Sequence, residues 1–580
     1  MKSRTSLFNP TAFKKDLTRF APAWVLYTVG LFMILTVVMM DDSEYYHAAS
    51  LADSLGFMAA INLCYGFLNG QLLFGDLFSA RHCNALHAMP LRRECWFATH
   101  MVSGLLFALV PNALMMLVAL PMLGSGWQVA LWWYLAAALE YLFFFGLAAL
   151  SALCVGNRFA MLLVYGIVNF FAVIVYWFYY TIYEPLLYGV FISEEPFLLF
   201  CPVWQMIDNY EVIHVARAEV EHLTYSEWFV ESVTLGEGWG YLAICAVLGM
   251  VFAGLALLLY RRRKLESAGD FMSVRALEPV FLVLYTLSMA AGFQIFAELF
   301  GVNEYVFLAL GLIVGFFTAR MLLMRTTKVF QAKGFIWFGI LAAAFAASML
   351  LTALDPVGVT RYIPDTDDID FVKVTTYYNP QHSEDPELTE DADIDIARQI
   401  HQMILDGQIK EADPYSQEEY YNNLCLYYVL DNGITVTRKY QAAASSPASQ
   451  LAGTLFTRPE YVIGTDDAEA FTKHVQRIYF DQDKADGQGV SGEIYMNYTN
   501  DDYIRGLVDA IMADCAEGTM AQNYSYHETE EQYGWVEFSL EYEADGDSWY
   551  GYRNITIYPS NRHTVAYLEA NPFPVEENYG

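Results

Sequence analysis

Long apolar segments alternate with short polar loops over the first 355 residues of the chain. A bilayer core of roughly 30 Å requires about 20 apolar residues in a helix. The pattern therefore predicts a polytopic α-helical membrane protein with about nine transmembrane helices. The predicted spans are approximately residues 21–40, 57–75, 98–123, 128–153, 159–183, 239–260, 279–300, 304–324 and 335–354.

The basic residues lie almost entirely on alternate loops. Of the 19 Lys and Arg residues before residue 355, 18 fall in loops that would share one side of a membrane, and only Arg217 falls on the other. Cytoplasmic loops carry an excess of Lys and Arg, so this distribution places the N-terminus inside. An odd number of spans then places residues 355–580 outside.

Residues 355–580 differ from the preceding part in composition, with 13 basic and 42 acidic residues and many tyrosines. Their pattern predicts an extracytoplasmic, acidic α+β domain of one or two cores. The predicted elements are a helix over 388–407, a hairpin from Tyr427 to Tyr440 turning at Asp431-Asn432-Gly433, helices near 466–479 and 501–516, and strands near 535–542 and 553–558. A helix followed by paired strands occurs twice, so an internal duplication is conceivable.

The first 20 residues predict an interfacial amphipathic helix. Asn9 is a suitable N-cap and Pro10 suits the first helical position. Phe13, Leu17 and Phe20 then recur at helical spacing, with charged residues off that face. An ordinary basic flank is the alternative. The span that follows has no small-residue cleavage site, so it is expected to remain as an anchor.

A patterned segment, residues 79–94, separates the second and third predicted spans. A short amphipathic helix here would present apolar side chains to a partner, while its charged residues orient it. The apolar candidates are Leu86, Met89 and Leu91 beside Pro90, and the charged candidates are Arg81, Arg92, Arg93 and Glu94. The alternative is a basic juxtamembrane loop that only fixes topology.

The string Ala-Met-Pro-Leu-Arg-Arg-Glu at 88–94 resembles the cytoplasmic coupling helix of type-2 ABC exporter permeases, which docks on an ATP-hydrolysing subunit. Residues 1–265 resemble the layout of that family: an elbow helix (1–20), then a six-helix core (21–265) with a long external loop (184–238). Apolar patches in this loop predict re-entrant or interfacial helices.

Three further spans (266–354) and the external domain (355–580) resemble a branch of these permeases found in Gram-positive bacteria of the Clostridia kind, whose C-terminal domain has no known function. The N-terminal strings at 6–9 and 13–20 also resemble that branch.

The chain lacks G-x-x-x-x-G-K-[ST] and contains no Gly-Lys dipeptide, so it is not itself a P-loop ATPase. We find no catalytic, cofactor-binding or metal motif and expect no enzyme activity. The resemblance implies that ATP and Mg²⁺ bind a partner ABC ATPase, and that a second permease subunit completes a homo- or heterodimer. Membrane lipid is a further partner, an extracellular peptide or accessory protein is a candidate one, and nucleic acid is not expected.

Several polar residues fall inside the predicted spans. Ionisable groups at membrane depth usually face a cavity or a partner. Glu140 is a candidate cavity residue with Asn112 and Asn169, and a carboxyl bonded to a neighbouring helix is the alternative. A Cys425–Cys515 disulfide and two buried free thiols are both compatible with the sequence.

Three functions remain open from the sequence. The first is the permease subunit of an ATP-driven exporter for an amphiphile such as a peptide antibiotic, lipid or envelope component. The second is an ATP-driven mechanical relay or envelope-stress sensor without transport. The third is an ATP-independent receptor with the tail as its ligand domain. The expected location is the cell membrane.

Overall fold

A computed structural model describes residues 8–40, 43–89, 91–208, 211–221, 226–377, 380, 383, 385–407, 421–443, 445–482, 490–495, 501–520, 532–544 and 547–572. The chain divides into two compact units. Unit 1 contains residues 1–183 and 194–349, and unit 2 contains residues 184–193 and 350–580. Unit 2 therefore includes part of the loop that the sequence analysis placed in the six-helix core.

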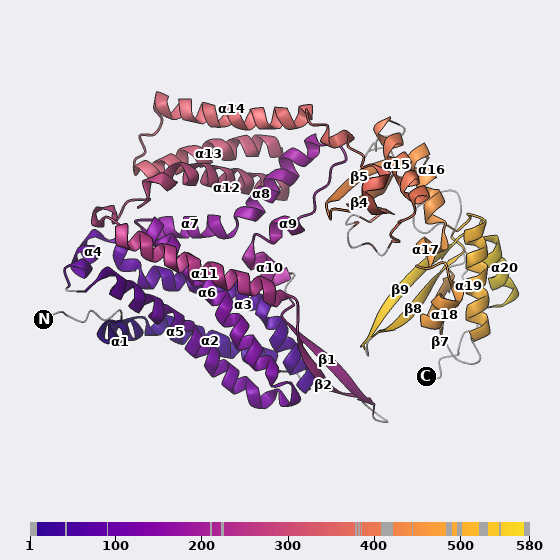
Figure 1. Ribbon diagram of the computed structural model, residues 1–580, viewed down its shortest axis with the longest axis horizontal. Helices are drawn as coiled ribbons and strands as arrows, with labels where there is room; N and C mark the ends of the chain where they lie inside the picture. Colours follow the sequence, from indigo (N-terminus) through magenta and orange to yellow (C-terminus); the bar gives the residue numbers. More distant parts are fainter. Residues whose placement is uncertain are drawn as a thin grey trace. The chain divides into compact units, whose positions relative to one another are not determined.

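Unit 1 is mainly helical, with one β-hairpin (Figure 1). Its elements are α1 (Pro10–Arg19), α2 (Ala21–Val38), α3 (Glu44–Leu73), α4 (Ala80–His87), α5 (Arg93–Ala119), α6 (Gln128–Cys154), α7 (Arg158–Asn169), α8 (Phe171–Phe178), α9 (Glu195–Leu198), α10 (Pro202–Asp208), β1 (Ile213–Glu221), β2 (Ser226–Leu235), α11 (Gly238–Arg262), α12 (Glu278–Leu299), α13 (Glu304–Met324) and α14 (Ala332–Leu354).

Among the described residues, eight helices are long and apolar enough to cross a membrane. A bent pair, Arg158–Asn169 with Phe171–Leu186, adds a ninth if it counts as one span. These helices fit a multi-pass membrane protein, but the predicted span at 159–183 is not one straight helix. It bends by 61° after Asn169 and ends in a π-helical turn at Tyr179–Tyr183.

Helix α6 lies at the centre of unit 1 and packs along α3, α5 and α11. Glycine permits the closest of these approaches. A Cβ placed on Gly249 of α11 would lie 2.6 Å from the carbonyl oxygen of Leu142 in α6. Small residues let apolar helices approach until their backbones touch, and close packing then replaces the hydrophobic effect as the attractive force.

The three-helix extension joins the core through two loops at the end of unit 1 that carries the basic residues, here called the basic end. Val155 pairs with Met272 in an antiparallel bridge. The amide of Ser273 donates to the carbonyl of Cys154 at 2.8 Å. Helix α12 then packs on α13, whereas α14 buries only Gly334.

The loop at 184–238 differs from its prediction. Short helices α9 and α10 are present, but Ile213–Glu221 and Ser226–Leu235 pair as the antiparallel strands β1 and β2, which the sequence did not predict. Ile213 and Val215 alternate with polar or small residues, and after the register shift at Ala216/Arg217 the alternation resumes with Ala218 and Val220, which was an available signal for a strand. The apolar patches in the same loop predicted short helices instead.

Unit 2 contains two antiparallel sheets, ordered β3-β4-β5 and β7-β6-β8-β9, each with its own core. The elements are β3 (Ile369–Thr375), α15 (Asp391–Leu405), β4 (Tyr421–Leu430), β5 (Thr435–Ala443), α16 (Pro447–Phe456), α17 (Pro459–Val462), α18 (Ala468–His474), β6 (Val475–Gln482), β7 (Val490–Tyr495), α19 (Asp501–Ala516), β8 (Gly534–Ala544), β9 (Asp547–Ile557) and α20 (Arg562–Ala570).

The predicted α15, the β4–β5 hairpin and α19 are confirmed, and Gly433 takes the positive φ of 77° that the turn requires. The helix predicted near 466–479 is wrong beyond His474. Residues from Val475 onward form β6, which pairs with β7 and β8 on its two edges. Long-range pairing overrides local helical propensity here.

Candidate functional site

The segment at 79–94 folds as the helix α4, a turn, and the first residues of α5. It lies at the basic end of unit 1. Cys83 and Leu86 of α4 are buried, so Leu86 is a core residue and does not form an exposed knob. Leu91 is half-buried against the same core. Pro90 lies outside the described residues.

Two of the predicted docking charges bond to unit 1 itself. The Arg93 guanidinium donates to the carbonyls of Tyr260 (3.1 Å) and Arg263 (2.8 Å), at the C-terminus of α11. Glu94 forms an ion pair with Arg261 at 3.1 Å. A cation at a helix C-terminus bonds to the last carbonyls and interacts favourably with the negative end of the helix dipole. Arg93 and Glu94 therefore fix α5 to α11.

Arg263, the residue after α11, extends these contacts to α6, and we call its hydrogen bonds to the neighbouring backbone the Arg263 clamp. It is 8% exposed. Its guanidinium donates to the carbonyls of Ala152 (3.1 Å) and Leu153 (3.3 Å), at the end of α6, and to that of Leu77 (3.1 Å), just before α4. One side chain thus joins three backbone ends. In the sequence, Arg263 is one of the 18 basic residues that predict the orientation in a membrane, and nothing there predicts its bonds to helix ends.

His87 closes the contact between α4 and α11. Its Nδ1 donates to the carbonyl of Cys83 at 2.8 Å, which leaves Nε2 to accept from the Tyr260 hydroxyl at 3.4 Å. Burial lowers the pKa of His87, and the nearby guanidinium groups of Arg93 and Arg263 lower it further. A neutral ring suits this arrangement because it needs one donor and one acceptor nitrogen.

Of the predicted docking residues that the structure describes, three are exposed, which is a smaller set than predicted. Arg81, Met89 and Arg92 are exposed, and Met89 has 42% of its surface accessible. We call these three residues the contact set. An exposed thioether between two cations can meet an apolar cleft with an acidic rim.

The elbow helix α1 is held by a buried pair that the sequence analysis did not anticipate. The predicted cap is confirmed, since Asn9 Oδ1 accepts from the amides of Thr11 and Ala12. Asp16, expected off the apolar face, is 5% exposed. Its carboxylate accepts from His100 Nδ1 (2.8 Å) and Ser103 Oγ (3.0 Å) on α5.

Glu140 lies at the middle of α6 and is fully buried. Its Oε2 accepts from Asn62 Nδ2 at 2.9 Å, and Oε1 has no hydrogen-bond partner among the described residues. The Tyr27 hydroxyl lies 3.0 Å from Asn112 Oδ1 and 3.5 Å from Asn62 Oδ1. Glu140 and Asn112 thus belong to one polar chain that crosses α2, α3, α5 and α6.

Asn169 is separate from that chain and lies at the bend between α7 and α8. Its amide donates to the carbonyl of Tyr165, four residues earlier, at 2.8 Å. Such bonds compete with the regular helix ladder and accompany breaks in helices. The Cys201 thiol bonds to the Asn169 carbonyl at 3.4 Å, which secures the bend.

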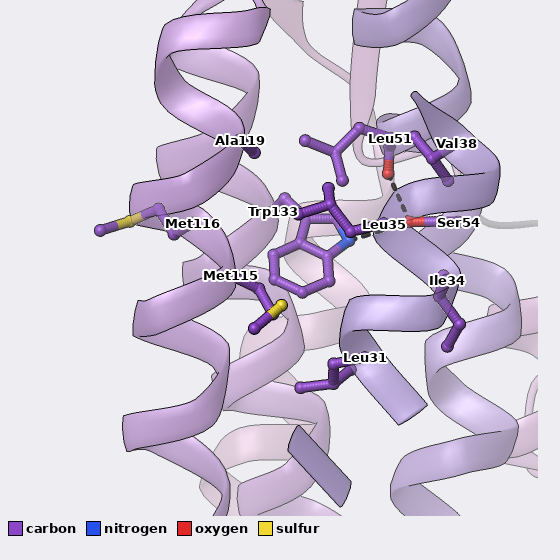
Figure 2. Close-up of a pocket in the computed structure, with 10 residues that line it drawn as sticks. All are labelled: Leu31, Ile34, Leu35, Val38, Leu51, Ser54, Met115, Met116, Ala119 and Trp133. Carbon is purple, nitrogen blue, oxygen red and sulfur yellow. Dashed lines mark hydrogen bonds between the residues drawn. The ribbon is translucent and has the colours of Figure 1, made fainter. Parts of the chain in front are cut away.

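An apolar pocket of about 320 Å³, including the space at its mouth, lies between α2, α3, α5 and α6 (Figure 2). Trp133 points into it from α6 and donates through Nε1 to Ser54 Oγ at 3.0 Å. The other side chains that line the pocket are aliphatic residues or methionines, including Leu31, Leu35 and Met115. Glu140, Asn112 and Asn169 do not line this pocket.

Unit 2 carries an arrangement that the sequence did not reveal. Residues 187–191, here called the strap, lie along the outer edge of β5. The amide of Lys439 donates to the Gly189 carbonyl at 2.9 Å, and the amide of Phe191 donates to the Thr437 carbonyl at 3.3 Å. Gly189 has a φ of 71°. A side chain there would collide with the ring of Tyr440.

β5 also holds the polypeptide that enters unit 2 after α14. Arg438 is 4% exposed and donates to the carbonyls of Val359 (2.8 Å) and Tyr362 (3.4 Å). Burial lowers the pKa of Lys439 to about 8, and the Glu184 carboxylate opposes that shift. One strand therefore contacts two segments that lead to unit 1.

The two cysteines of the proposed disulfide, Cys425 and Cys515, are free and buried. Burial raises the pKa of each thiol to about 12, so neither is a reactive thiolate at neutral pH.

Asp514, Glu517 and His563 lie close enough together to suggest a metal site. The Asp514 carboxylate, however, already accepts from the amides of His563 (3.0 Å) and Thr564 (2.8 Å) at the start of α20. It functions as a helix cap, which accounts for the cluster without a metal.

Comparison with protein-family models, curated proteins and solved structures finds no match to this chain.

Proposed function

We propose that the chain is the membrane subunit of an ATP-driven exporter, and that a separate ATPase binds its basic end at the contact set. The orientation that follows from the charge distribution makes this end cytoplasmic and unit 2 extracytoplasmic. The substrate would be an amphiphile, such as a peptide, lipid or envelope component. A second permease subunit would complete the path.

The observation that supports this proposal best is the Arg263 clamp. The contact set lies on α4 and in the turn after it, a segment joined to the ends of α6 and α11 by hydrogen bonds of Arg93 and Arg263. A force on this segment would therefore move both helices together. An ATPase that closes on ATP binding could supply such a force, whereas a loop that only fixes topology needs no clamp.

The test is co-purification of the full chain from native membranes, with partner ATPase detected by mass spectrometry and by ATP hydrolysis. We expect Met89→Asp to lower ATPase recovery by about tenfold or more, since a charge against an apolar cleft costs several kcal/mol. Met89 is exposed, so the chain itself should fold normally.

Arg217→Asp serves as the control because Arg217 lies on the opposite side in the predicted topology. Equal recovery of the ATPase with Met89→Asp and with the unaltered chain would remove the main support for the proposal.

A second candidate function, mechanical signalling without transport, is favoured by the strap. Residues 184–193 fold with unit 2, so the segments that follow the fifth span and the last span both bond to β5. Movement of the fifth span would pull on the edge of a sheet, and ligand binding to the sheet would act in reverse.

Gly189→Ala separates the two functions. The added Cβ would meet the Tyr440 ring and release the strap, so we expect faster hydrogen exchange at Lys439. Gly453→Ala is the matched control, since nothing lies within 4 Å of that position. A relay predicts that Gly189→Ala abolishes stimulation of the ATPase through unit 2. Unchanged stimulation would leave only the export function.

A further inference from the structure

The four-stranded sheet of unit 2 has one face covered by helices and one face open among the described residues. Helices α18, α19 and α20 share a core with its inward side chains, such as Ile478, Phe538 and Ile555. Figure 1 shows α19 and α20 on that side of the sheet. The alternate residues of the strands point the other way.

The open face is aromatic. The rings of Tyr479 and Trp535, on neighbouring strands, lie 5.2 Å apart. Tyr495 on β7 and Tyr552 on β9 are 49% and 57% exposed. Tyr495 pairs with Arg477, and Ser539 pairs with both Arg477 and Tyr552, so the two tyrosines end one row across the four strands. Two exposed tyrosines and the half-buried pair Tyr479 and Trp535 thus give one face of the sheet an aromatic surface.

The open face is also acidic. Arg477 is its one basic residue among those described, and it bonds to Glu493 (3.1 Å) and Glu537 (3.3 Å). Asp481 and Glu541 project from the same side of β6 and β8. Four carboxylates and one guanidinium leave a net negative charge on the face, within a tail that has far more acidic than basic residues.

We propose that this face binds a cationic amphiphilic peptide. Tyr and Trp rings attract ammonium and guanidinium groups and also stack on aromatic or aliphatic side chains. The carboxylates add long-range attraction for cations. An anionic polysaccharide would be repelled by the same charges, although aromatic rings alone would suit sugars. The proposal does not depend on the proposed ATPase, because binding needs unit 2 only.

The experiment uses the full chain in nanodiscs of zwitterionic lipid, with empty nanodiscs as the blank. The probe is a fluorescent peptide of Lys, Trp and Leu, and its comparison peptides carry Glu in place of Lys. We expect binding by fluorescence anisotropy that weakens as salt increases. The Glu peptide and a neutral chito-oligosaccharide should not bind.

Two sets of variants locate the site. Trp535→Ala with Tyr552→Ala should weaken peptide binding by about tenfold or more, because two aromatic contacts with the cationic peptide are lost. Asp481→Asn with Glu541→Gln should weaken it less and flatten the salt dependence. Tyr552→Ala alone keeps the test valid if the double variant folds poorly, because this ring is largely exposed.

Asp502→Asn with Asp509→Asn is the matched control, because it removes two exposed charges from α19 on the helical side of the same sheet. It should leave the affinity unchanged. Equal loss in the control would indicate a general attraction to an acidic domain and overturn the proposal. Preferential binding of the oligosaccharide, or no change in the Trp535 and Tyr552 variants, would also overturn it.

Discussion

Unit 1 and unit 2 satisfy their buried polar groups in different ways. In unit 1, Arg263 and Asn62 bond mainly to backbone carbonyls and side-chain carbonyl or carboxyl oxygens of neighbouring helices, and the buried ionisable pair Asp16–His100 joins only the elbow helix to α5. In unit 2, titratable groups are central: His401 lies between two tyrosine hydroxyls, and Asp514 caps α20.

The difference follows from the surroundings of the two units. Apolar helices that fit a membrane cannot exchange a lost internal hydrogen bond for water. Their packing must therefore be specified by small residues and by complete bonding of the helix ends. A domain in water can use ionisable groups, and its stability then depends on pH. We expect steric and bonding defects to be most damaging in unit 1, and acid to act on unit 2.

The largest effect is expected for Gly249→Leu. The α6 backbone lies where the new side chain would begin, so α11 would have to move away from the central helix. We expect loss of the monodisperse peak in size-exclusion chromatography in detergent. Gly254→Leu on the same helix, where nothing lies within 4 Å, should behave as the unaltered chain. Equal behaviour of the two variants would contradict close packing of α6 and α11.

Arg263→Met should be the next most damaging change. It leaves the carbonyls of Ala152, Leu153 and Leu77 without their donor, at a cost of about 3 kcal/mol or more. The measurement is thermal unfolding of the purified chain in detergent. Arg262→Met removes the same charge from an exposed position and should change the transition little. A similar shift in both variants would mean that charge, rather than capping, matters here.

Acid should destabilise unit 2 through His401. Burial and, to a smaller extent, the nearby Arg438 guanidinium together lower the pKa of this imidazole to about 3, against about 6.5 for an unfolded histidine. Below pH 6.5 the unfolded state binds a proton that the folded state excludes. Stability is therefore complete above pH 6.5 and falls towards pH 3 by up to about 1.4 kcal/mol per unit.

His401→Gln should flatten this dependence, measured by thermal scans of the full chain between neutral and mildly acidic pH. His563 provides the contrast, since the Glu517 carboxylate raises its pKa and acid brings no such loss there. An unchanged acid profile in His401→Gln would show that other groups control the transition.

Local patterns in the sequence predicted the features that depend on neighbouring residues. The Asn9 cap, the turn at Gly433 and the helix at 501–516 are of this kind. The Arg263 clamp, the strap and the burial of Asp16 depend on residues brought together from distant parts of the chain. No periodicity encodes those contacts, because the same residue types are equally common on solvated loops.

The candidate site shows the same limit. The order of apolar and charged residues predicted that 79–94 is a docking segment. It did not predict which of its side chains face outward. Leu86 packs in the core of unit 1, and Arg93 and Glu94 bond to the end of α11, so these three side chains face inward. Met89 and Arg92 remained exposed. The functional role of the segment stays a prediction, and only packing could sort its residues into buried and exposed ones.

The smallest effect is expected for Glu140→Gln, which tests whether unit 1 uses any titratable group at its centre. Asn62 Nδ2 donates to one carboxyl oxygen at 2.9 Å, and the amide oxygen of glutamine can accept the same bond. If Glu140 only joins α6 to α3, the transition temperature and the function should change little. Glu140→Leu should instead cost about 1–3 kcal/mol, since Asn62 would lose its carboxyl partner in a fully buried position and keep only its longer bonds. Thermal unfolding of both variants, followed by an export or signalling assay, separates the outcomes. If Glu140→Gln folds normally but loses function, the carboxyl group itself is required, and the polar chain through Tyr27 and Asn112 would become a working part of unit 1 and not only its scaffold.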